Sequence, residues 1–429
     1  MEGLRERLRR QLVAARGRTL ELIEAASESD LARRADPSLG PGLWDLGHLA
    51  SFEDLWGVRR VLGERARVTA PELDELYDAF EQPRSARTDL PLLGRDEALA
   101  LLESVRARTL GGLEEAQLDG DDPLQRAGFV YSMLVQHEAQ HQETLLQSLH
   151  HLGIAIPTAN VDLEREVVDD ERRIALPGAV IEIGQTVSWG PYDNERPAHR
   201  LELAPFALDQ FPVTNRRFLA FVEDGGYGRG ELWSDAGRAW LARSGAQFPE
   251  GWSRTDDGSW QVRRFGRNLP LDPTEPVQHI SCHEAEAFGV WAGGRLPTEF
   301  EWECAAIVGR RHDPYPWGKA EIDDSRANVG QRRDGPAPVG TYPCGASSLG
   351  HEQLLGDVYE WTSSDFDGYP GFEPFPYPEY SQVFFGQGYR VLRGASWAAD
   401  ASLARATYRN WDLPERRQLF AGCRLAWDA

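Results

Sequence analysis

The chain has 429 residues, a length that corresponds to two or three domains. Its 68 acidic and 46 basic residues give a formal net charge of −22, and a field of that sign repels phosphate backbones, so we expect no nucleic-acid partner. Lys319 is the only lysine, which nearly excludes lysine Schiff-base and pyridoxal phosphate chemistry.

The cysteines and the apolar runs predict the compartment. The four cysteines are far apart and form no Cys-x-x-Cys pair, which fits a reducing environment. No run of 18 apolar residues would cross a bilayer, and the first ten residues lack the apolar core of a secretory signal. We therefore expect a cytoplasmic protein with no membrane partner, and a monomer.

Residues 1–153 are predicted to form a four-helix bundle. Leu4, Leu8, Leu12, Val13 and Leu20 follow helical spacing, and clear turn residues precede later helical segments. The expected helices cover residues 4–20, 44–62, 95–115 and 125–152. Between the second and the third lies a proline-containing loop at 66–93, and a loop of that length is more often functional than accidental.

From about residue 174 glycine, proline, tryptophan and tyrosine become frequent. Short apolar runs predict strands and longer periodic stretches predict helices, so we expect an α+β domain rich in loops. The expected strands are 180–183, 199–203 and 389–393, and the expected helices are 214–222, 282–292 and 298–306. The domain is assigned to residues 174–429, and a charged connector at 154–173 joins it to the bundle.

A group of histidines in the bundle is the first candidate for chemistry. His137 and His141 are four residues apart, so their side chains share one helical face, about 6 Å apart along the axis. His48 is the only histidine before them, with Phe52 one turn later on the same face. Two imidazoles chelate a divalent metal when a third ligand comes from another helix, and three histidines suit iron or zinc with open positions.

Two other interpretations of these histidines stay open. A buried histidine is often only a core residue, and this applies most to His48 taken alone. Residues 137–141 also match the His-Glu-x-x-His pattern of zinc proteases, with Glu138 as general base. A protease would need a further ligand downstream, for which Glu164 or Glu166 is the candidate.

Several phrases in the second half carry a family resemblance. In chain order they are Leu-Pro-Thr-Glu-Phe-Glu-Trp-Glu at 296–303, Gly-Asp-Val-Tyr-Glu-Trp-Thr at 356–362, Arg-Gly-Ala-Ser-Trp at 393–397 and Gly-Cys-Arg-Leu-Ala at 422–426. Together they resemble the formylglycine-generating-enzyme family, which implies a C-type-lectin-like α+β fold. The enzymes of that family use two cysteines after the third phrase. The matching positions look like Ala399 and Ala404, so their copper-dependent cysteine oxidation is not expected.

The first half resembles the DinB-like four-helix bundle, which commonly holds a metal with three histidines. The two domains in this order resemble the sulfoxide synthases of ergothioneine biosynthesis, which are non-haem iron enzymes. The resemblance implies that His48, His137 and His141 bind Fe(II). It also implies a dioxygen-dependent reaction that joins the thiol of γ-glutamylcysteine to the imidazole C2 of hercynine (Nα-trimethylhistidine). In the product the sulfur is oxidised to a sulfoxide. In such a reaction the two substrates supply the electrons that reduce dioxygen, so no flavin or nicotinamide is needed. The sequence agrees with this, because it contains no dinucleotide-binding fingerprint.

Residues 408–418 resemble the substrate-binding segment of this family. Trp411 can offer an aromatic face to a quaternary ammonium, and Asn410 can add a carbonyl dipole beside it. Asp412 can receive the α-ammonium of a glutamyl group, and Arg416 can hold a carboxylate through two hydrogen bonds. A surface turn with incidental charges is the alternative interpretation.

The resemblance also implies substrate contacts within the bundle. An arginine of the loop 66–93 is expected to bind the carboxylate of the thiol substrate, and spacing does not decide between Arg84 and Arg87. Together with the acidic and basic residues of segment 408–418, these arginines favour γ-glutamylcysteine over free cysteine. Gln140, one residue before a ligand histidine, is expected to bond the substrate imidazole.

The aromatic segment 368–380 supplies the expected proton donor. By resemblance Tyr377 donates a proton near the reacting oxygen, and Tyr380 beside it binds the imidazole. A phenol suits this role because it can donate a proton or a hydrogen bond. Packing of both rings against the neighbouring prolines is the alternative interpretation.

Two further functions remain compatible with the sequence. A related synthase of the same architecture could use cysteine or another thiol, or attack another imidazole carbon as in ovothiol biosynthesis. A non-catalytic binding module with a vestigial metal site belongs to a different class, and it would keep its ligand affinity without metal.

Overall fold

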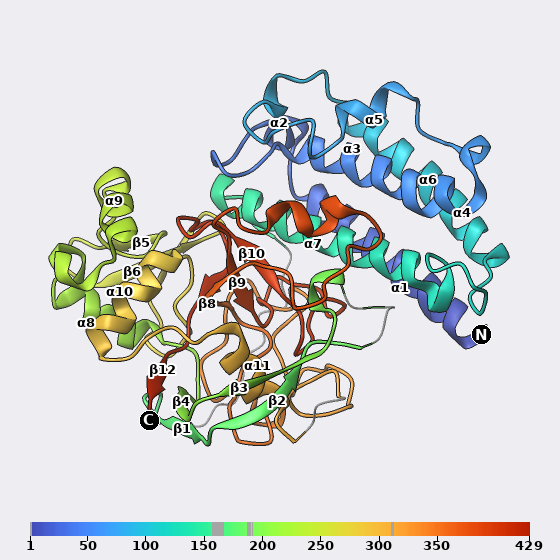
Figure 1. Cartoon of the computed structure of the whole chain (residues 1–429). Coiled ribbons are helices and arrows are strands. Elements are labelled where there is room, and N and C mark those ends of the chain that lie inside the picture. The colour runs from blue at the N-terminus through green and yellow to red at the C-terminus, as the bar shows by residue number, and fades with distance from the viewer. Residues whose placement is uncertain (1, 157–166, 187–189, 191, 310–312) are drawn as a thin grey trace. The chain divides into compact units, whose positions relative to one another are not determined.

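The computed structural model describes residues 2–156, 167–186, 190, 192–309 and 313–429. The chain divides into two compact units, Met1–Pro157 and Thr158–Ala429, whose elements are labelled in Figure 1. Of the predicted connector 154–173, residues 157–166 lie outside the described part of the chain.

The first unit is a bundle of long helices. Four of them lie alongside one another (Figure 1): α1 (Glu2–Glu24), α3 (Gly42–Glu53), α6 (Arg95–Glu115) and α7 (Phe129–Leu152). α1 packs on α7, and α3 packs on both α6 and α7. Leucines at helical spacing face the core, among them Leu8 and Leu12 of α1 and Leu145 and Leu149 of α7. The predicted four-helix bundle is confirmed.

The second predicted helix contains a π-helical turn that its sequence pattern did not indicate. α3 is continued by a π-helix at Asp54–Arg59 and then by α4 (Arg60–Leu62). Asp54 is fully buried, and it accepts hydrogen bonds from the backbone N of Val68 at 2.9 Å and from Oγ1 of Thr69 at 2.7 Å. The loop that follows is thereby attached to the π turn.

The loop at 66–93 has structure of its own. It contains α5 (Glu72–Leu76) and a 3₁₀ turn at Arg87–Asp89. Tyr77, directly after α5, is 1% exposed, so it anchors the loop in the bundle core. A smaller helix, α2 (Glu28–Ala32), lies between α1 and α3 in the chain and begins with a capping box.

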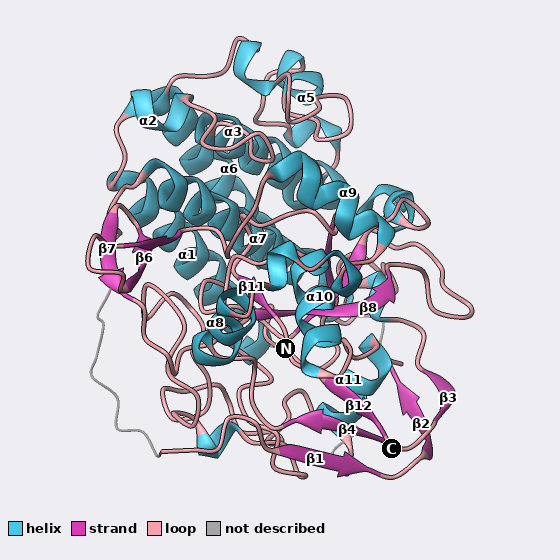
Figure 2. Ribbon diagram, turned by 90° about the vertical axis from the view of Figure 1, so that its left-hand side faces the viewer, coloured by secondary structure: helices cyan, strands magenta, loops and turns pink. Residues whose placement is uncertain are grey.

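The second unit is built from small sheets. The largest has the strand order β10–β9–β8–β11 and comprises Asn410–Asp412, Arg390–Arg393, Tyr359–Asp365 and Ala421–Gly422. Figure 2 shows the sheet β1–β4–β12, which comprises Arg173–Leu176, Phe206–Asp209 and Ala426–Asp428. β2 and β3 pair as Ala179–Ile183 and His199–Leu203, and β5–β6–β7 comprises Trp252–Arg254, Trp260–Arg264 and Arg267–Pro270. Pairing is antiparallel throughout these sheets except between β8 and β11.

Helices border these sheets, and most of them were predicted. They are α8 (Asn215–Glu223), α9 (Asp235–Ser244), α10 (Cys282–Ala292) and α11 (Glu299–Ile307). Capping boxes start α10 and α11, which explains why their boundaries could be read from the sequence. α9 and most of the short strands were missed. The predicted α+β domain is confirmed.

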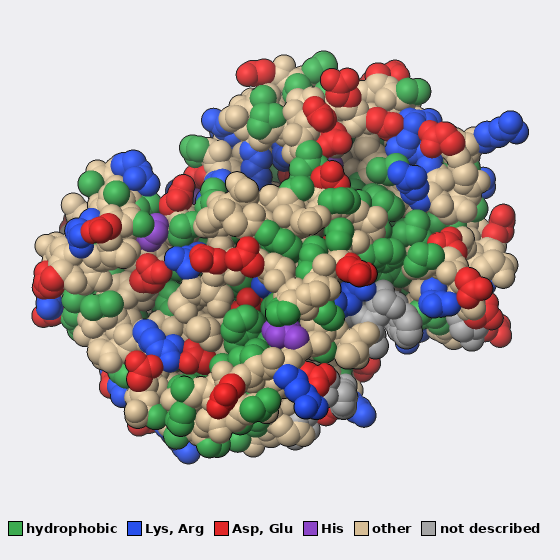
Figure 3. Space-filling view, viewed as in Figure 1, with side chains coloured by type: hydrophobic (Ala, Val, Ile, Leu, Met, Phe, Trp, Pro, Cys, Tyr) green, Lys and Arg blue, Asp and Glu red, His purple; other side chains and the backbone are tan. Residues whose placement is uncertain are grey.

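The surface is charged and mixed. On the face shown in Figure 3, acidic and basic side chains are interspersed. The exposed large apolar side chains come from separate parts of the sequence, for example Val13, Phe80, Val180 and Val290. Within the described residues, no helix combines the length and the apolar character that a bilayer span requires.

Four charged side chains, one from each long helix, meet in the core of the bundle. Arg16 donates to Glu138 at 2.7 Å and to Glu53 at 2.8 Å, and Arg106 donates to the same two carboxylates at 2.6 and 2.7 Å. All four are buried. Burial would lower the pKa of Arg106, but the two carboxylates raise it above its usual value. Burial would raise the pKa of Glu138, but the two arginines hold it below its usual value. We refer to these residues as the buried charge cluster.

Glu53→Gln is expected to lower the free energy of unfolding by about 3 kcal/mol, because it leaves two buried arginines facing one carboxylate. Urea unfolding of the full chain, followed by circular dichroism, measures the loss. The matched control is Arg9→Gln, which breaks the exposed pair of Arg9 with Glu114 and should cost less than about 1 kcal/mol. Equal losses in the two variants would contradict a stabilising role for the cluster.

Because the pKa of Glu138 is lowered on folding, its share of the stability is fully present above the pKa of the unfolded carboxyl. It disappears as the pH falls through the folded pKa. Urea unfolding of the native chain should therefore show this contribution in full at neutral pH and lose it in acid.

Candidate metal centre and active-site residues

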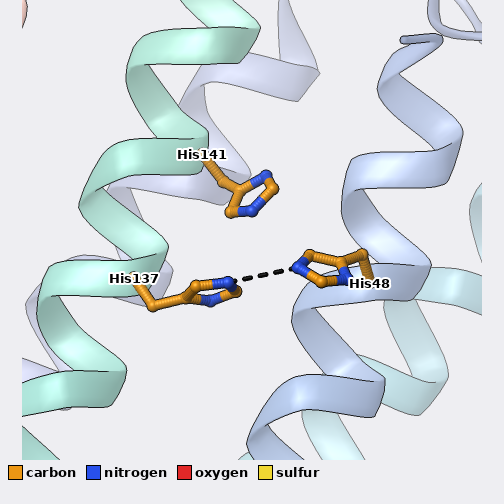
Figure 4. Close-up of side chains that lie close together, drawn as sticks. All are labelled: His48, His137 and His141. Carbon is orange, nitrogen blue, oxygen red and sulfur yellow. Dashed lines mark hydrogen bonds between the residues drawn. The ribbon is translucent and has the colours of Figure 1, made fainter. Parts of the chain in front are cut away.

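Three imidazoles converge inside the bundle. His48 lies on α3, and His137 and His141 lie one turn apart on α7, so the two helices present these side chains to one another (Figure 4). One ligand nitrogen from each ring lies within 4.8 Å of the other two. Nε2 of His48 and Nε2 of His137 are 3.1 Å apart. The structure brings together the three histidines that the sequence singled out.

Two of the rings are held from behind by oxygen atoms. Nδ1 of His48 lies 2.7 Å from the carbonyl O of Tyr77, and Nδ1 of His141 lies 3.0 Å from Oδ1 of Asp45. These contacts leave Nε2 of both rings for the centre of the cluster. Metal-binding histidines usually have such a carbonyl or carboxylate partner. The sequence analysis missed Asp45, whose position one turn before His48 on the same helix was the available signal.

Two of the imidazoles are stacked against aromatic rings, and their burial determines their protonation state. Trp44 stacks on His48 with centroids 4.7 Å apart, and Phe52 stacks on His137 at 3.7 Å. Burial, and then the charge of the neighbouring imidazoles, lower the pKa of His48 and His137 well below the ordinary value. Both rings are therefore neutral at pH 7 and offer lone pairs to a cation.

This donor set fits a divalent transition metal. Two nitrogens bound at about 2.1 Å and at right angles around one ion are roughly 3.0 Å apart. The 3.1 Å separation of the Nε2 atoms of His48 and His137 agrees with that value. Three imidazoles suit iron or zinc, and three protein ligands leave coordination positions for small molecules.

Glu138 is not free to act as the general base of a zinc protease. Its carboxylate is 2% exposed and accepts hydrogen bonds from Arg16 and Arg106 in the buried charge cluster. The protease interpretation of the His-Glu-x-x-His pattern is therefore wrong. The further ligands considered for it, Glu164 and Glu166, lie outside the described residues.

The structure distinguishes the two candidate arginines of the loop. Arg87 is buried, and its guanidinium carbon lies 3.3 Å from the ring centroid of Trp44, the residue that stacks on a cluster histidine. Its Nε donates to the carbonyl of Gln82 at 2.9 Å. Among the described residues it has no carboxylate within ion-pair distance, although the more distant Asp45 carboxylate acts on its charge. Burial lowers its pKa to about 10, so it stays charged at pH 7. Arg84 is exposed and donates to the carbonyl of Ser38 at 2.9 Å.

Gln140 lies on α7 three residues after His137 and one before His141. Residues three apart are neighbours on a helix surface, whereas adjacent residues diverge by about 100°. Gln140 therefore flanks His137, and its side chain is partly buried. Its contact with substrate stays a prediction.

In the second unit the two predicted tyrosines lie together. The ring centroids of Tyr377 and Tyr380 are 5.4 Å apart, and both side chains are partly buried. Tyr380 also contacts the buried Tyr192 at 4.8 Å. Burial raises the pKa of Tyr380 well above the ordinary value, so the phenol stays protonated and can donate a hydrogen bond. The two rings thus contact one another as well as any neighbouring prolines.

A short 3₁₀ turn before β3 holds this tyrosine segment in place. Asp193 accepts hydrogen bonds from Oγ of Ser381 and from the backbone N of Phe375, the latter at 3.2 Å. Nδ2 of Asn194 donates to the same Ser381 hydroxyl at 3.1 Å. Burial raises the pKa of Asp193 to about 6. The sequence analysis missed this turn, whose role depends on contacts between residues almost 190 positions apart.

The same turn also holds the chain that leads into the substrate-binding segment. Glu195 pairs with Arg405, whose Nε lies 2.9 Å from Oε2. Arg409 donates to the carbonyl of Asn194 at 2.6 Å and forms a two-bond ion pair with Glu299 at 2.7 and 2.9 Å. The turn at 193–195 therefore ties together the two segments that carry the predicted substrate contacts.

The four predicted substrate-binding residues at 410–416 lie on β10 and just after it, not on an isolated surface turn. Trp411 stacks on Phe366 with centroids 4.3 Å apart, and the tilted ring of Phe384 lies 5.4 Å from the same indole, so a cation could meet only the part that these two rings leave uncovered. Oδ1 of Asn410 accepts a hydrogen bond from the backbone N of Trp411 at 2.9 Å. Nε of Arg416 lies 3.6 Å from Oδ1 of Asp412, so the acid and the base form a pair.

Ala399 and Ala404, the positions that the resemblance to the formylglycine-generating enzymes singles out, are both buried. The four cysteines of the chain are free thiols. Burial raises the pKa of Cys282 and Cys423 well above the ordinary value, and protonated buried thiols are poor nucleophiles.

Both halves match known protein families. The model of the DinB superfamily matches residues 11–145, and the model of the sulfatase-modifying factor enzyme 1-like domain matches residues 161–429. The predicted pairing of a DinB-like bundle with a formylglycine-generating-enzyme-like domain is confirmed. An inactive C-alpha-formylglycine-generating enzyme 2 from Mus musculus is 32% identical and aligns with 61% of this chain and 87% of its own length.

Two relatives align with nearly the entire chain. A hercynine oxygenase from Mycolicibacterium thermoresistibile is 43% identical over 99% of this chain and 95% of its own length. A hercynine oxygenase from Mycobacterium tuberculosis is 41% identical over 99% of both chains. Identity of this extent shows that the chain belongs to the hercynine oxygenase family.

Proposed function

We propose that the chain is an Fe(II)- and dioxygen-dependent sulfoxide synthase that joins the sulfur of γ-glutamylcysteine to the imidazole C2 of hercynine. The observation that carries this proposal is the cluster of three imidazoles, in a chain similar along its length to hercynine oxygenases. His48, His137 and His141 would hold the iron, which would supply the activation of dioxygen. One oxygen atom ends in the sulfoxide and the other leaves as water, so the two substrates supply all the electrons.

Arg87 is the better candidate for the carboxylate of the cysteinyl group. It is buried, keeps its charge and has no carboxylate partner among the described residues, whereas Arg84 is exposed. A desolvated guanidinium binds a carboxylate through short, charge-assisted hydrogen bonds. The stack of Arg87 on Trp44, and of Trp44 on His48, would bring that carboxylate near the metal.

Segment 410–416 supports a glutamyl group as the second part of the thiol substrate. The paired Asp412 and Arg416 match the ammonium and the carboxylate of an α-amino acid. γ-Glutamylcysteine has this α-amino acid group and, in addition, the carboxylate of its cysteinyl group, whereas free cysteine has only one carboxylate. The part of the Trp411 ring that Phe366 and Phe384 leave uncovered would receive the trimethylammonium of hercynine, with Asn410 beside it. Tyr380, and separately Gln140 of the bundle, are the proposed partners of the imidazole.

Tyr377 would donate the proton in the oxygen chemistry. A partly buried phenol beside Tyr380 can donate a hydrogen bond to a reacting oxygen and then its proton. Asp193 and Asn194 would keep the segment in position through Ser381.

The proposed reaction is tested directly with the full chain. Iron-loaded protein is mixed with hercynine and one thiol under anaerobic conditions, oxygen is admitted, and the product is identified by mass. We expect the hercynine sulfoxide adduct with γ-glutamylcysteine and a kcat/KM at least about tenfold lower with free cysteine. Equal values for the two thiols would contradict the dipeptide assignment. Full ligand affinity without turnover would favour a binding module.

Arg87→Gln is expected to raise the KM for γ-glutamylcysteine about 10- to 100-fold with a smaller change in kcat, because a buried carboxylate would lose its charged partner. Arg84→Gln is the matched control on the same loop and should change the KM less than about twofold. A larger effect in Arg84→Gln would reverse the assignment. Titration with Co(II) in both variants checks that the histidine cluster is intact.

Tyr377→Phe is expected to divert turnover from the sulfoxide towards simple oxidation of the thiol, because it removes only the hydroxyl proton. Mass spectrometry of the products and oxygen consumption measure the partition. Tyr380→Phe, the neighbouring change, should raise the KM for hercynine and leave the partition nearer the native value. The role of Tyr377 is refuted by an unchanged ratio of sulfoxide to disulfide.

A further inference from the structure

Tyr77 connects a cluster histidine to the arginine-bearing loop through three separate contacts. Its carbonyl O lies 2.7 Å from Nδ1 of His48. Its ring lies against Gly47, where an added Cβ would be 2.1 Å from Cζ of the tyrosine. Its hydroxyl O accepts a hydrogen bond from the backbone N of Leu93 at 2.8 Å. With 1% of its surface exposed, Tyr77 is part of the bundle core and part of the loop at once.

The loop is attached to α3 at neighbouring points as well. The carbonyl O of Leu76 accepts a hydrogen bond from Nε1 of Trp44 at 3.2 Å, so two successive carbonyls of the loop, those of Leu76 and Tyr77, face α3. Between Tyr77 and Leu93 the chain carries Arg87, whose guanidinium lies over the same Trp44 ring. Residues 77–93 therefore form a closed loop. Its last residue, Leu93, is hydrogen-bonded to the side chain of its first residue, Tyr77.

The tautomer of His48 links this loop to metal binding. A metal at Nε2 of His48 requires the lone pair of that nitrogen, so the ring proton must be on Nδ1, where it is donated to the carbonyl of Tyr77. In the other tautomer the proton is on Nε2, 3.1 Å from Nε2 of His137, and the Tyr77 carbonyl loses its donor. Metal binding and the hydrogen bond to Tyr77 thus select the same form of the ring.

We propose that Tyr77 is a positioning residue through which metal binding at the three histidines and the order of residues 77–93 stabilise one another. Coupling of this kind is reciprocal, so an ordered loop also strengthens metal binding. The consequence for catalysis rests on the proposed function. If Arg87 binds the carboxylate of the thiol substrate, metal and thiol strengthen each other's binding through the loop, in addition to any direct bond between them.

Hydrogen exchange with Co(II) as the only added ligand tests the coupling without requiring turnover. Co(II) should slow amide exchange in peptides covering residues 77–93 of the full chain by about fivefold or more. Tyr77→Phe keeps the carbonyl and the ring and loses only the bond to Leu93. It should therefore retain the cobalt-induced protection next to residue 77 and lose it around residues 90–93.

Gly47→Ala tests the same connection from the helix. The new methyl group would displace the Tyr77 ring, and the affinity for Co(II) should fall about fivefold or more, measured by calorimetry. The matched control is Tyr131→Phe, which removes another buried tyrosine hydroxyl, one with no hydrogen-bond partner in the described part of the chain. It should change neither the exchange nor the affinity. Circular dichroism checks the fold, and Tyr77→Phe decides if Gly47→Ala does not fold.

The proposal is overturned if Co(II) binds to the three histidines of the native chain and leaves the exchange of residues 77–93 unchanged. Full cobalt-induced protection at residues 90–93 in Tyr77→Phe overturns it as well. Failure of the proposed function has a different signature. In that case the coupling is present in the exchange data, but the iron-loaded protein forms no sulfoxide.

Discussion

The buried charge cluster is the interaction on which the first unit depends. Each long helix contributes one member, and each arginine binds both carboxylates, so a slip or rotation of any helix would leave a charge unpaired in the core. An unpaired buried charge costs several kcal/mol, far more than an apolar misfit of similar size. Glu53 is five residues after His48, and Glu138 directly follows His137, so the cluster fixes the two helices where the histidines must meet.

Buried arginine–glutamate pairs perform the same task in the second unit, where sheets are too small to order the long connections. Arg409 with Glu299, Arg405 with Glu195 and Arg424 with Glu360 are all buried or nearly so. Two of these arginines also donate to backbone carbonyls of other segments, Arg409 to Asn194 and Arg424 to Asp209. An arginine fixed by its glutamate can therefore hold more than one irregular segment through charge-assisted hydrogen bonds. This explains how a loop-rich domain can hold tyrosine, tryptophan and aspartate side chains in defined places.

The sequence could predict features whose pattern repeats over many neighbouring residues, and it could not predict features that depend on contacts between distant residues. The long helices have a period that repeats over many residues, and His137 and His141 share a face because of that same period. The π turn at Asp54–Arg59 and the three-residue strand β10 contain too few residues to show a period. Tyr77 supports His48 through a contact that forms only when the loop meets α3, so no local pattern marks it. Asp45 lies one turn before His48, but the histidine that it contacts is His141 on α7, which only the fold brings near. The choice between Arg84 and Arg87 depends on how the loop turns, which their spacing does not encode.

The net charge of −22 suggests that the acidic dipeptide of the proposed reaction would be repelled, and the local surroundings of Arg87 bear on this conflict. Charges farther than a Debye length, about 8 Å at physiological salt, are largely screened, so the nearest groups decide the potential at the site. The atoms in contact with the Arg87 guanidinium are the face of Trp44 and the carbonyls of Gln82 and Ala79, all without net charge. They stabilise it by their dipoles and quadrupole, and the charged groups that act on it from beyond contact distance are one carboxylate and one guanidinium, those of Asp45 and Arg84. A carboxylate partner from the protein would have stabilised the arginine more strongly and closed it to an anionic ligand. Holding a buried arginine with neutral groups is thus how a strongly acidic protein can keep one site attractive to a carboxylate.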